Sequence, residues 1–142
     1  MNVNEVMSAR PVTVSPEESA AVAARLLSRH NIGALPVCCK NGALKGMITD
    51  RDIVLRCIAA DEDPHTTKVS EIMTRRVFSI EASESLDKAT ALMAKEQIRR
   101  LPVQEKGRVV GMLSLGDLAC RPGSKTEAGQ ALSNISSNIK TI

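Results

Sequence analysis

The feature that most constrains this chain is an internal repeat. The 142-residue sequence aligns with itself after a shift of about 66 residues, and the matching segments keep their order. Three pairs of segments match: VNEVMSAR (3–10) with VSEIMTRR (69–76), NIGALPV (31–37) with QIRRLPV (97–103), and GMITDRDI (46–53) with GMLSLGDL (111–118). We therefore expect two similar units that fold alike.

Each repeat carries the pattern of a β-α-β-β-α unit behind a short lead-in helix that holds Val6 and Met7, or Ile72 and Met73. Ser15 is expected to cap the first long helix, with its mate beginning near Glu81. Alternating or apolar runs predict strands, and Asn-Gly and Lys-Gly pairs predict hairpin turns. The expected strands are PVTV (11–14), VFSI (77–80), ALPVCC (34–39) and RLPVQE (100–105), each hairpin adding a third strand, and the closing helices are DIVLRCIA (52–59) and DLAC (117–120).

The expected fold is α/β (α+β), with two pseudo-twofold-related β-α-β-β-α repeats packed through their sheets. One repeat of this size buries too little apolar surface to be stably folded on its own. The predicted organisation is repeat 1 at 1–60, a polar linker at 61–68, repeat 2 at 69–121 and a helical tail at 122–142. The tail packs either on the same module or on a second chain.

Composition narrows the function classes. The net charge is +3 and the charges are interspersed, so a nucleic-acid surface is not expected, and a single aromatic residue, Phe78, offers no platform for stacking bases. No apolar run is long enough to span a bilayer, and the N-terminus lacks a signal pattern. We expect a cytoplasmic protein that binds neither nucleic acid nor membrane.

The cysteines and histidines form no recognisable metal or catalytic pattern. The four cysteines are Cys38, Cys39, Cys57 and Cys120, and no C-x-x-C pair occurs among them. Reduced, mostly buried thiols are the expectation, with a zinc or redox role through Cys38, Cys39 and His30 as an alternative. No nucleophile stands beside a base, so we expect no enzyme activity and no required cofactor.

The two strings of the form G-x-x-[ST]-x-x-D admit two interpretations. Thr49 with Asp52, and Ser114 with Asp117, have the spacing of a capping box at the start of a helix. The same hydroxyl can instead donate to a phosphate while the acid accepts ribose hydroxyls. The glycine that opens each string lets either another backbone or a ligand come close. Spacing alone does not decide between these interpretations.

The ordered series of motifs resembles a pair of CBS domains, often called a Bateman module. The residues that carry the resemblance are the V-x-E-[VI]-M lead-ins, the two Leu-Pro-Val segments and the two G-x-x-[ST]-x-x-D strings, and they cover residues 3–120. The length is similar to that of free-standing bacterial CBS pairs, so we expect no attached catalytic or transporter domain. The resemblance implies a cleft between the repeats that binds AMP, ADP, ATP, NAD or S-adenosylmethionine as a regulatory ligand.

The resemblance also implies roles for individual residues. Asp52 and Asp117 would hold ribose hydroxyls, and Thr49 and Ser114 would contact phosphate or ribose. The remaining expected ligand-binding residues are Gly33, Ala34, Arg99 and Arg100 before the Leu-Pro pairs, and Ser15 and Ala20, which match additional pocket-lining positions in the first repeat. Arg100 matches a position that often binds phosphate. Of the two strings, the first, which contains Thr49-Asp50-Arg51-Asp52 (TDRD), is the first choice for the occupied site.

The resemblance further implies a homodimer through the helices that follow the two strings. Ile53, Val54, Cys57 and Ile58 would supply the apolar face.

The leading function implied by the resemblance is a sensor of an adenosine-containing ligand that signals to a regulated protein. The alternative is a ligand-free dimerisation module in which the capping boxes are purely structural.

Overall fold

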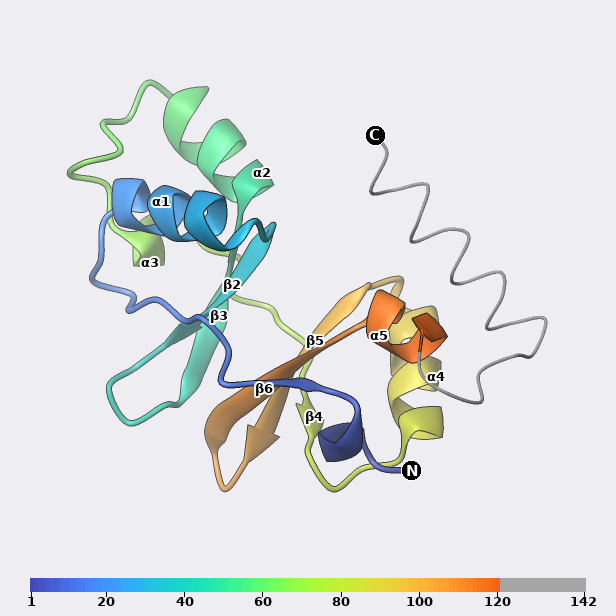
Figure 1. Cartoon of the computed structure of the whole chain (residues 1–142). Coiled ribbons are helices and arrows are strands. Elements are labelled where there is room, and N and C mark those ends of the chain that lie inside the picture. Colours follow the sequence, from blue (N-terminus) through green and yellow to red (C-terminus); the bar gives the residue numbers. More distant parts are fainter. Residues whose placement is uncertain (121–142) are drawn as a thin grey trace. The chain divides into compact units, whose positions relative to one another are not determined.

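The computed structural model describes residues 1–120, which form two compact units (Figure 1). We name each unit after the last four residues of its G-x-x-[ST]-x-x-D string, TDRD (49–52) or SLGD (114–117). The TDRD unit comprises Pro11–Val77 and Lys106–Val109. The SLGD unit comprises Met1–Arg10, Phe78–Glu105 and the described residues from Val110 onward. The predicted helical tail lies outside the described residues.

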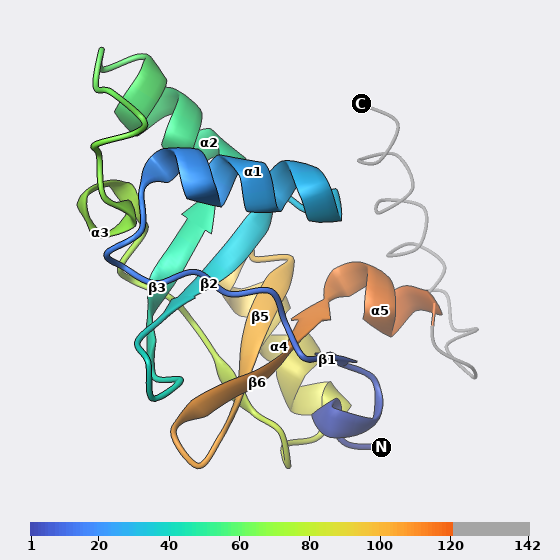
Figure 2. The same ribbon diagram turned by 60° about the vertical axis from the view of Figure 1, so that its left-hand side comes forward.

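The TDRD unit is built on one β-hairpin. Its elements are α1 (Ala20–His30), β2 (Ala34–Cys38), β3 (Leu44–Thr49), α2 (Asp50–Ile53), a π-helical continuation of α2 (Val54–Ile58) and α3 (Val69–Ile72). Strands β2 and β3 are antiparallel, and Val14 adds a parallel bridge to Val37. Figure 2 shows α1 and α2 side by side near the ends of these strands.

The SLGD unit contains a four-stranded sheet of order β1-β6-β5-β4. Its elements are a 3-10 turn (Val3–Glu5), β1 (Ser8–Ala9), β4 (Ile80–Glu81), α4 (Leu86–Glu96), β5 (Arg100–Glu105), β6 (Arg108–Ser114) and α5 (Leu115–Cys120). Strand β1 runs antiparallel to β6, and β4 runs parallel to β5. The edge positions are therefore held by two-residue strands.

Each unit receives its lead-in segment from the other sequence repeat. The N–H groups of the lead-ins donate to carbonyl groups just before α1 and α4: Val69 to Glu18 (2.8 Å), Ser70 to Pro16 (3.0 Å), Val3 to Glu84 (2.8 Å) and Asn4 to Ala82 (3.0 Å). The same pairing occurs twice, as the repeat requires. The compact units are therefore assembled from both repeats, with the lead-ins exchanged.

The predicted hairpins are confirmed. Strands β2 and β5 fall on the ALPVCC and RLPVQE segments, and β3 and β6 end at the hydroxyl of each string. Gly42 has a φ of 87°, and Lys106 and Gly107 have φ of 53° and 76°. Positive φ at both central residues of the second turn matches the strand twist of a tight hairpin.

The predicted starts of the long helices are wrong. Helix α1 is capped by Ser19, whose hydroxyl accepts from the N–H of Val22 (3.2 Å), and α4 is capped by Ser85. Ser15 does not cap α1, because the carbonyls of residues 16 and 18 accept hydrogen bonds from the second lead-in. That tertiary pairing holds the segment outside the helix and outweighs its local capping signal.

Other element boundaries differ from expectation in length. The PVTV segment contributes a single bridge at Val14, and the VFSI segment only reaches the start of β4 at Ile80. The first lead-in forms a 3-10 turn that ends at Glu5, before Val6 and Met7. The first closing helix begins at Asp50 and widens to π geometry from Val54. Short segments with few ladder bonds take their form from what they pack against.

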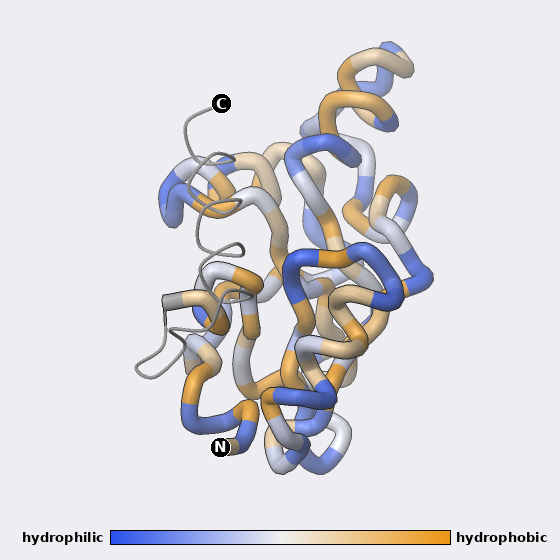
Figure 3. The backbone as a smooth tube through the Cα atoms, turned by 90° about the vertical axis from the view of Figure 1, so that its right-hand side faces the viewer, coloured by the Kyte–Doolittle hydropathy of each residue, from blue (hydrophilic) through white to orange (hydrophobic). Residues whose placement is uncertain are grey.

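Each unit has its own apolar core. In the TDRD unit, α1, β2, β3 and the closing helix bury Ala20, Ala23, Leu27, Leu35, Val37, Ile48, Ile53 and Cys57. In the SLGD unit the corresponding elements bury Leu86, Ala89, Met93, Leu101, Val103, Leu113 and Leu118. Hydrophobic and hydrophilic stretches alternate along the helices (Figure 3), as helices that cover a sheet on one face require.

Candidate functional site

Both G-x-x-[ST]-x-x-D strings form complete capping boxes. The hydroxyl of Thr49 accepts from the N–H of Asp52 (3.0 Å), and the Asp52 carboxylate accepts from the N–H of Thr49 (3.1 Å). Ser114 and Asp117 make the same reciprocal pair at 3.0 Å in each direction. The structural interpretation of the spacing is therefore confirmed. Capping still leaves each carboxylate able to accept further hydrogen bonds, because an ionised carboxylate offers about four acceptor sites.

The segment before each Leu-Pro pair meets the start of the closing helix. The N–H of Asp50 donates to the carbonyl of Gly33 (3.1 Å), and Ala34 is the register partner of Thr49. In the SLGD unit the N–H of Leu115 donates to the carbonyl of Arg99 (2.8 Å). Each unit thus brings the expected ligand-binding residues before its Leu-Pro pair next to the start of its closing helix, where the hydroxyl and the carboxylate lie.

The two arginines and the two remaining predicted residues lie in different environments. Arg99 and Arg100 are exposed at the start of β5, beside the SLGD string. Ser15 is half-buried, and its hydroxyl accepts from the N–H of Glu17 (3.3 Å). Ala20 is fully buried in the core of the TDRD unit. The ligand contacts predicted for these four residues stay predictions.

The carboxylate of Asp52 is buried and surrounded by donors. Asp52 is 7% exposed. The hydroxyl of Thr74 lies 3.2 Å from both carboxylate oxygens, and Nε of Arg56 lies 4.0 Å from Oδ1. Arg56 also donates from one terminal nitrogen to the carbonyls of Ile72 (3.2 Å) and Met73 (3.3 Å). Asp52 is therefore tied to the second lead-in, at the residues around the end of α3.

The carboxylate of Asp117 is more open. Asp117 is half-buried, and Oδ2 accepts from Ser114 as described above. Ser8 occupies the repeat position of Thr74, and the backbone register is the same: Ser8 is paired with Met112 as Thr74 is with Met47. Ser8 is exposed, and within the described part of the chain its hydroxyl makes no hydrogen bond to Asp117. The carboxylate of Asp117 is thus more accessible to solvent than that of Asp52.

The glycines of the strings accommodate another backbone. A Cβ on Gly46 would lie 2.6 Å from the carbonyl oxygen of Thr74, and one on Gly111 would lie 2.8 Å from that of Ser8. Real Cβ atoms do not approach other atoms so closely. Each glycine therefore lets the exchanged lead-in pair with the third strand, which is one of the two interpretations that the sequence left open.

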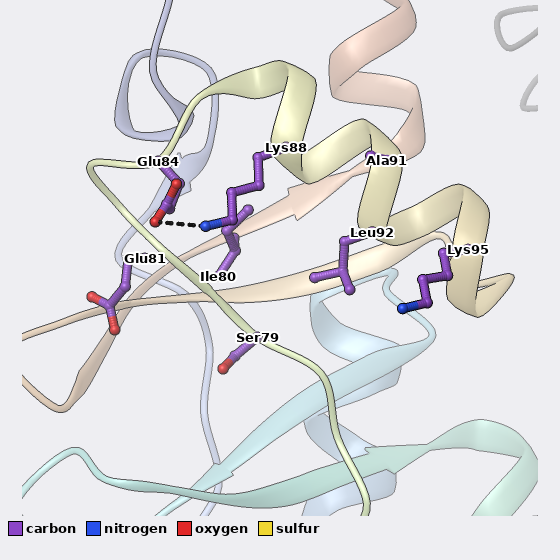
Figure 4. Close-up of a pocket in the computed structure, with 8 residues that line it drawn as sticks. All are labelled: Ser79, Ile80, Glu81, Glu84, Lys88, Ala91, Leu92 and Lys95. Atoms are coloured by element: carbon purple, nitrogen blue, oxygen red, sulfur yellow. Dashed lines mark hydrogen bonds and ion pairs between the residues drawn. The ribbon is translucent and has the colours of Figure 1, made fainter.

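A separate pocket of about 420 Å³ lies beside α4 in the SLGD unit (Figure 4). Its lining residues are Ser79, Ile80, Glu81, Glu84, Lys88, Ala91, Leu92 and Lys95. Lys88 is paired with Glu84 across its rim at 3.2 Å. A groove of about 330 Å³ in the TDRD unit runs between α1 and α2, lined by Ala24, Leu27, Ser28, Ile32, Asp50, Ile53 and Val54. Neither contains a residue predicted to bind ligand.

Cys38, Cys39 and Cys57 are free thiols. Cys38 and Cys57 are buried, and Cys39 is half-buried. Burial, with a smaller contribution from neighbouring Cys39, raises the pKa of the Cys38 thiol to about 11. A thiol with that pKa stays protonated at neutral pH and is a poor nucleophile and metal ligand. Within residues 1–120, no three His, Cys, Asp or Glu side chains cluster in a way that suits a metal ion.

The closing helix of the TDRD unit exposes an apolar face, which differs in part from the predicted one. Val54, Leu55 and Ile58 are 55%, 49% and 54% exposed. Ile53 and Cys57 are buried in the core and do not contribute to this face. The difference arises because Ile53 and Cys57, which lie one turn apart, face the core of their own unit. None of the helices in residues 1–120 combines the length and the apolar character needed to cross a bilayer.

Sequence reasoning missed the two partners of Asp52. Arg56 follows Asp52 by four residues, a spacing that favours an ion pair on a helix and that was available as a signal. Thr74 carries no such local signal, because it lies 22 positions further along the chain. Only the exchange of lead-ins brings it to the carboxylate.

Comparison with known proteins agrees with this architecture. The family model for the CBS domain matches residues 3–58 and 69–121. The CBS domain-containing protein YhcV of Bacillus subtilis is 46% identical over 135 residues, which cover 95% of each chain. The crystal structure of Hypoxic Response Protein I with two coordinated zinc ions matches with a TM-score of 0.78 at 34% identity, covering 84% of this chain and 97% of that one.

A second solved structure shows a ligand-bound relative. The CBS domain pair of protein MJ0100, in complex with 5′-methylthioadenosine and S-adenosyl-L-methionine, matches with a TM-score of 0.75 at 32% identity, covering 89% of this chain and 98% of that one. The sequence motifs, the doubled units and the family match coincide over most of the chain. The chain therefore belongs to the CBS-domain family, as a tandem pair of CBS domains.

Proposed function

We propose that this chain is a regulatory module that binds an adenosine-containing small molecule and performs no chemistry on it. The observation that carries the proposal is the clustering at each string of a hydroxyl, a carboxylate and the backbone before the Leu-Pro pair. The MJ0100 domain pair, which is similar over nearly its whole length, was crystallised with two adenosyl compounds. That supports the ligand class.

The chemistry of the cluster suits a nucleoside. A carboxylate accepts two hydroxyl hydrogen bonds at once, which matches the 2′ and 3′ hydroxyls of a ribose. The exposed Arg99 and Arg100 beside the SLGD string suit a phosphate or carboxylate further along the ligand. With no Trp or Tyr in the chain, adenine would be held by aliphatic groups and backbone. We expect micromolar affinity, about −7 to −8 kcal/mol.

The alternative is a ligand-free dimerisation module. Its support is the completeness of both capping boxes, which explains the strings without a ligand, and the exposed apolar face of Val54, Leu55 and Ile58. Under this alternative a homodimer through the closing helices would be the whole function. Both hypotheses allow the dimer, so ligand binding is what separates them.

Thermal denaturation with added ligand tests the proposal. The panel is AMP, ADP, ATP, NAD, S-adenosylmethionine and 5′-methylthioadenosine, with GMP as the control for the base. A ligand at 100 times its dissociation constant adds about 2.7 kcal/mol to the stability, which raises the Tm by roughly 5–10 °C for a chain of this size. A Tm that no adenosyl compound moves favours the dimerisation module.

A further inference from the structure

The carboxylates of the two strings occupy unequal positions although their sequence signatures are the same. Asp52 is 7% exposed and faces the Thr74 hydroxyl at 3.2 Å from both of its oxygens. Arg56 lies against the same carboxylate and caps the carbonyls at the end of α3. We name this set, Asp52 with Thr74 and Arg56, the clasp. It fastens the lead-in of the second repeat to the TDRD unit.

A ligand that used Asp52 would have to open the clasp. Asp52 is 7% exposed, and the Thr74 hydroxyl lies 3.2 Å from both carboxylate oxygens, so ribose hydroxyls reach them only if the Thr74 side chain moves away. Thr74 would then lose its acceptor in a half-buried position. Replacing one donor by another gains little, whereas leaving a polar group unsatisfied costs free energy. Ligand binding at this string would therefore be opposed by the packing of the lead-in.

The SLGD string lacks this competition. Asp117 is half-buried, and within residues 1–120 the counterpart of Thr74 is Ser8, which is exposed and makes no hydrogen bond to it. The backbone pairing of the lead-in is preserved, so the difference lies in the side chains. The exposed Arg99 and Arg100 also lie beside this string and not beside the other.

We propose that the two strings have divided their roles: Asp52 is a structural residue of the clasp, and Asp117 is the carboxylate that accepts the ribose of the ligand. The second part rests on the proposed function, and the first part does not. The division reverses the preference for the TDRD string that the sequence suggested. It also makes Thr74 and Arg56 positioning residues for the lead-in.

Matched variants at the two strings test the proposal. Asp52→Asn and Asp117→Asn remove the same charge from equivalent capping boxes, and Thr74→Val and Ser8→Ala remove the equivalent hydroxyls. Thermal unfolding without ligand should show a lower Tm for Asp52→Asn than for Asp117→Asn, and for Thr74→Val than for Ser8→Ala. Equal Tm losses within each pair would overturn the clasp, whether or not any ligand binds.

Titration calorimetry then assigns the ligand carboxylate, using whichever of AMP or S-adenosylmethionine stabilises the unmodified protein more. Asp117→Asn should weaken binding about tenfold or more, and Thr74→Val should change it less than about threefold. Tighter binding by Thr74→Val, or loss of binding in Asp52→Asn with Asp117→Asn unaffected, would overturn the assignment. If Asp52→Asn does not fold, the affinity of Thr74→Val for the ligand decides whether Asp52 takes part in binding. If the unmodified protein binds neither compound, the proposed function fails while the unfolding comparison still decides the clasp.

Discussion

Replacing Gly46 by alanine should destabilise the protein through one close contact. A Cβ at this position would lie 2.6 Å from the carbonyl oxygen of Thr74 and 3.0 Å from Sδ of Met73. The thioether can rotate away, but the carbonyl belongs to a backbone that is bonded to β3. The Thr74 carbonyl accepts from the N–H of Met47 at 2.9 Å, and the reverse bond is 2.8 Å. The lead-in must therefore move away from β3.

The expected magnitude follows from these contacts. Overpacking a buried position costs about 1–3 kcal/mol, and weakening the Met47–Thr74 pair adds about 1 kcal/mol. Alanine restricts the unfolded chain more than glycine does, which returns about 0.5–1 kcal/mol. The net loss is about 1–3.5 kcal/mol. At roughly 2–4 °C per kcal/mol, the Tm should fall by about 2–14 °C.

The control is Gly116→Ala, in α5 of the SLGD unit. Its Cβ would meet only Oγ of Ser114 at 3.7 Å, an ordinary contact. Alanine also favours a helix over glycine by up to about 1 kcal/mol, so the Tm should stay unchanged or rise. Both variants are measured by thermal unfolding followed by circular dichroism. A Gly46→Ala protein that melts with the unmodified one would refute the packing of the exchanged lead-in on β3.

Two further predictions concern the helix caps and the thiols. Ser19→Ala should cost about 1 kcal/mol in urea unfolding because it removes the acceptor for the first turn of α1, whereas Ser15→Ala should cost clearly less; the reverse order would restore the cap that the sequence suggested. With iodoacetamide at neutral pH, peptide mapping should find Cys39 modified before the buried Cys38, whose raised pKa keeps it protonated until alkaline pH. Cys38 reacting first at neutral pH would contradict this protection.

The sequence predicted the parts of the fold that depend on local signals. Strands β2 and β5 each contain a Leu-Pro-Val segment, and the turns that follow them contain glycine at positive φ. The apolar residues, the turn chemistry and the repeat all indicated the same elements there. The capping boxes were equally local, because both partners lie within four residues. Agreement between these levels is what makes a local prediction dependable.

The sequence failed where a distant segment competes with a local signal. Ser15, Pro16 and Glu18 have the spacing of a helix start, yet two of their carbonyls are acceptors for Val69 and Ser70. Self-alignment could not reveal this, because lead-ins that stay with their own repeat and lead-ins that are exchanged give the same sequence pattern. The starts of α1 and α4 were therefore misplaced in both repeats, for the same reason in each.

The candidate site shows the same limit. Local spacing makes the two strings look equivalent, and Arg51 beside Thr49 was the sequence feature that favoured the first string. Access to a carboxylate is set instead by what packs over it, which here is the difference between Thr74 and Ser8. Both are hydroxyl residues in the same register, so residue class alone does not separate them. Thr74 bonds to a buried acid that also has Arg56 beside it, and Ser8 does not bond to its counterpart in the described residues.

A repeated fold gives one copy the freedom to become structural. The exchanged lead-ins need an anchor in each unit, and in the TDRD unit the acid at the start of the closing helix accepts a hydrogen bond from the Thr74 hydroxyl of the lead-in, while Arg56 donates to the lead-in backbone. Once such an acid is buried and paired, removing one partner costs more than the pair itself contributes, so the arrangement is not easily reversed. Under the proposed division of roles, the other copy does not hold its lead-in through this carboxylate, which leaves Asp117 available for a ligand.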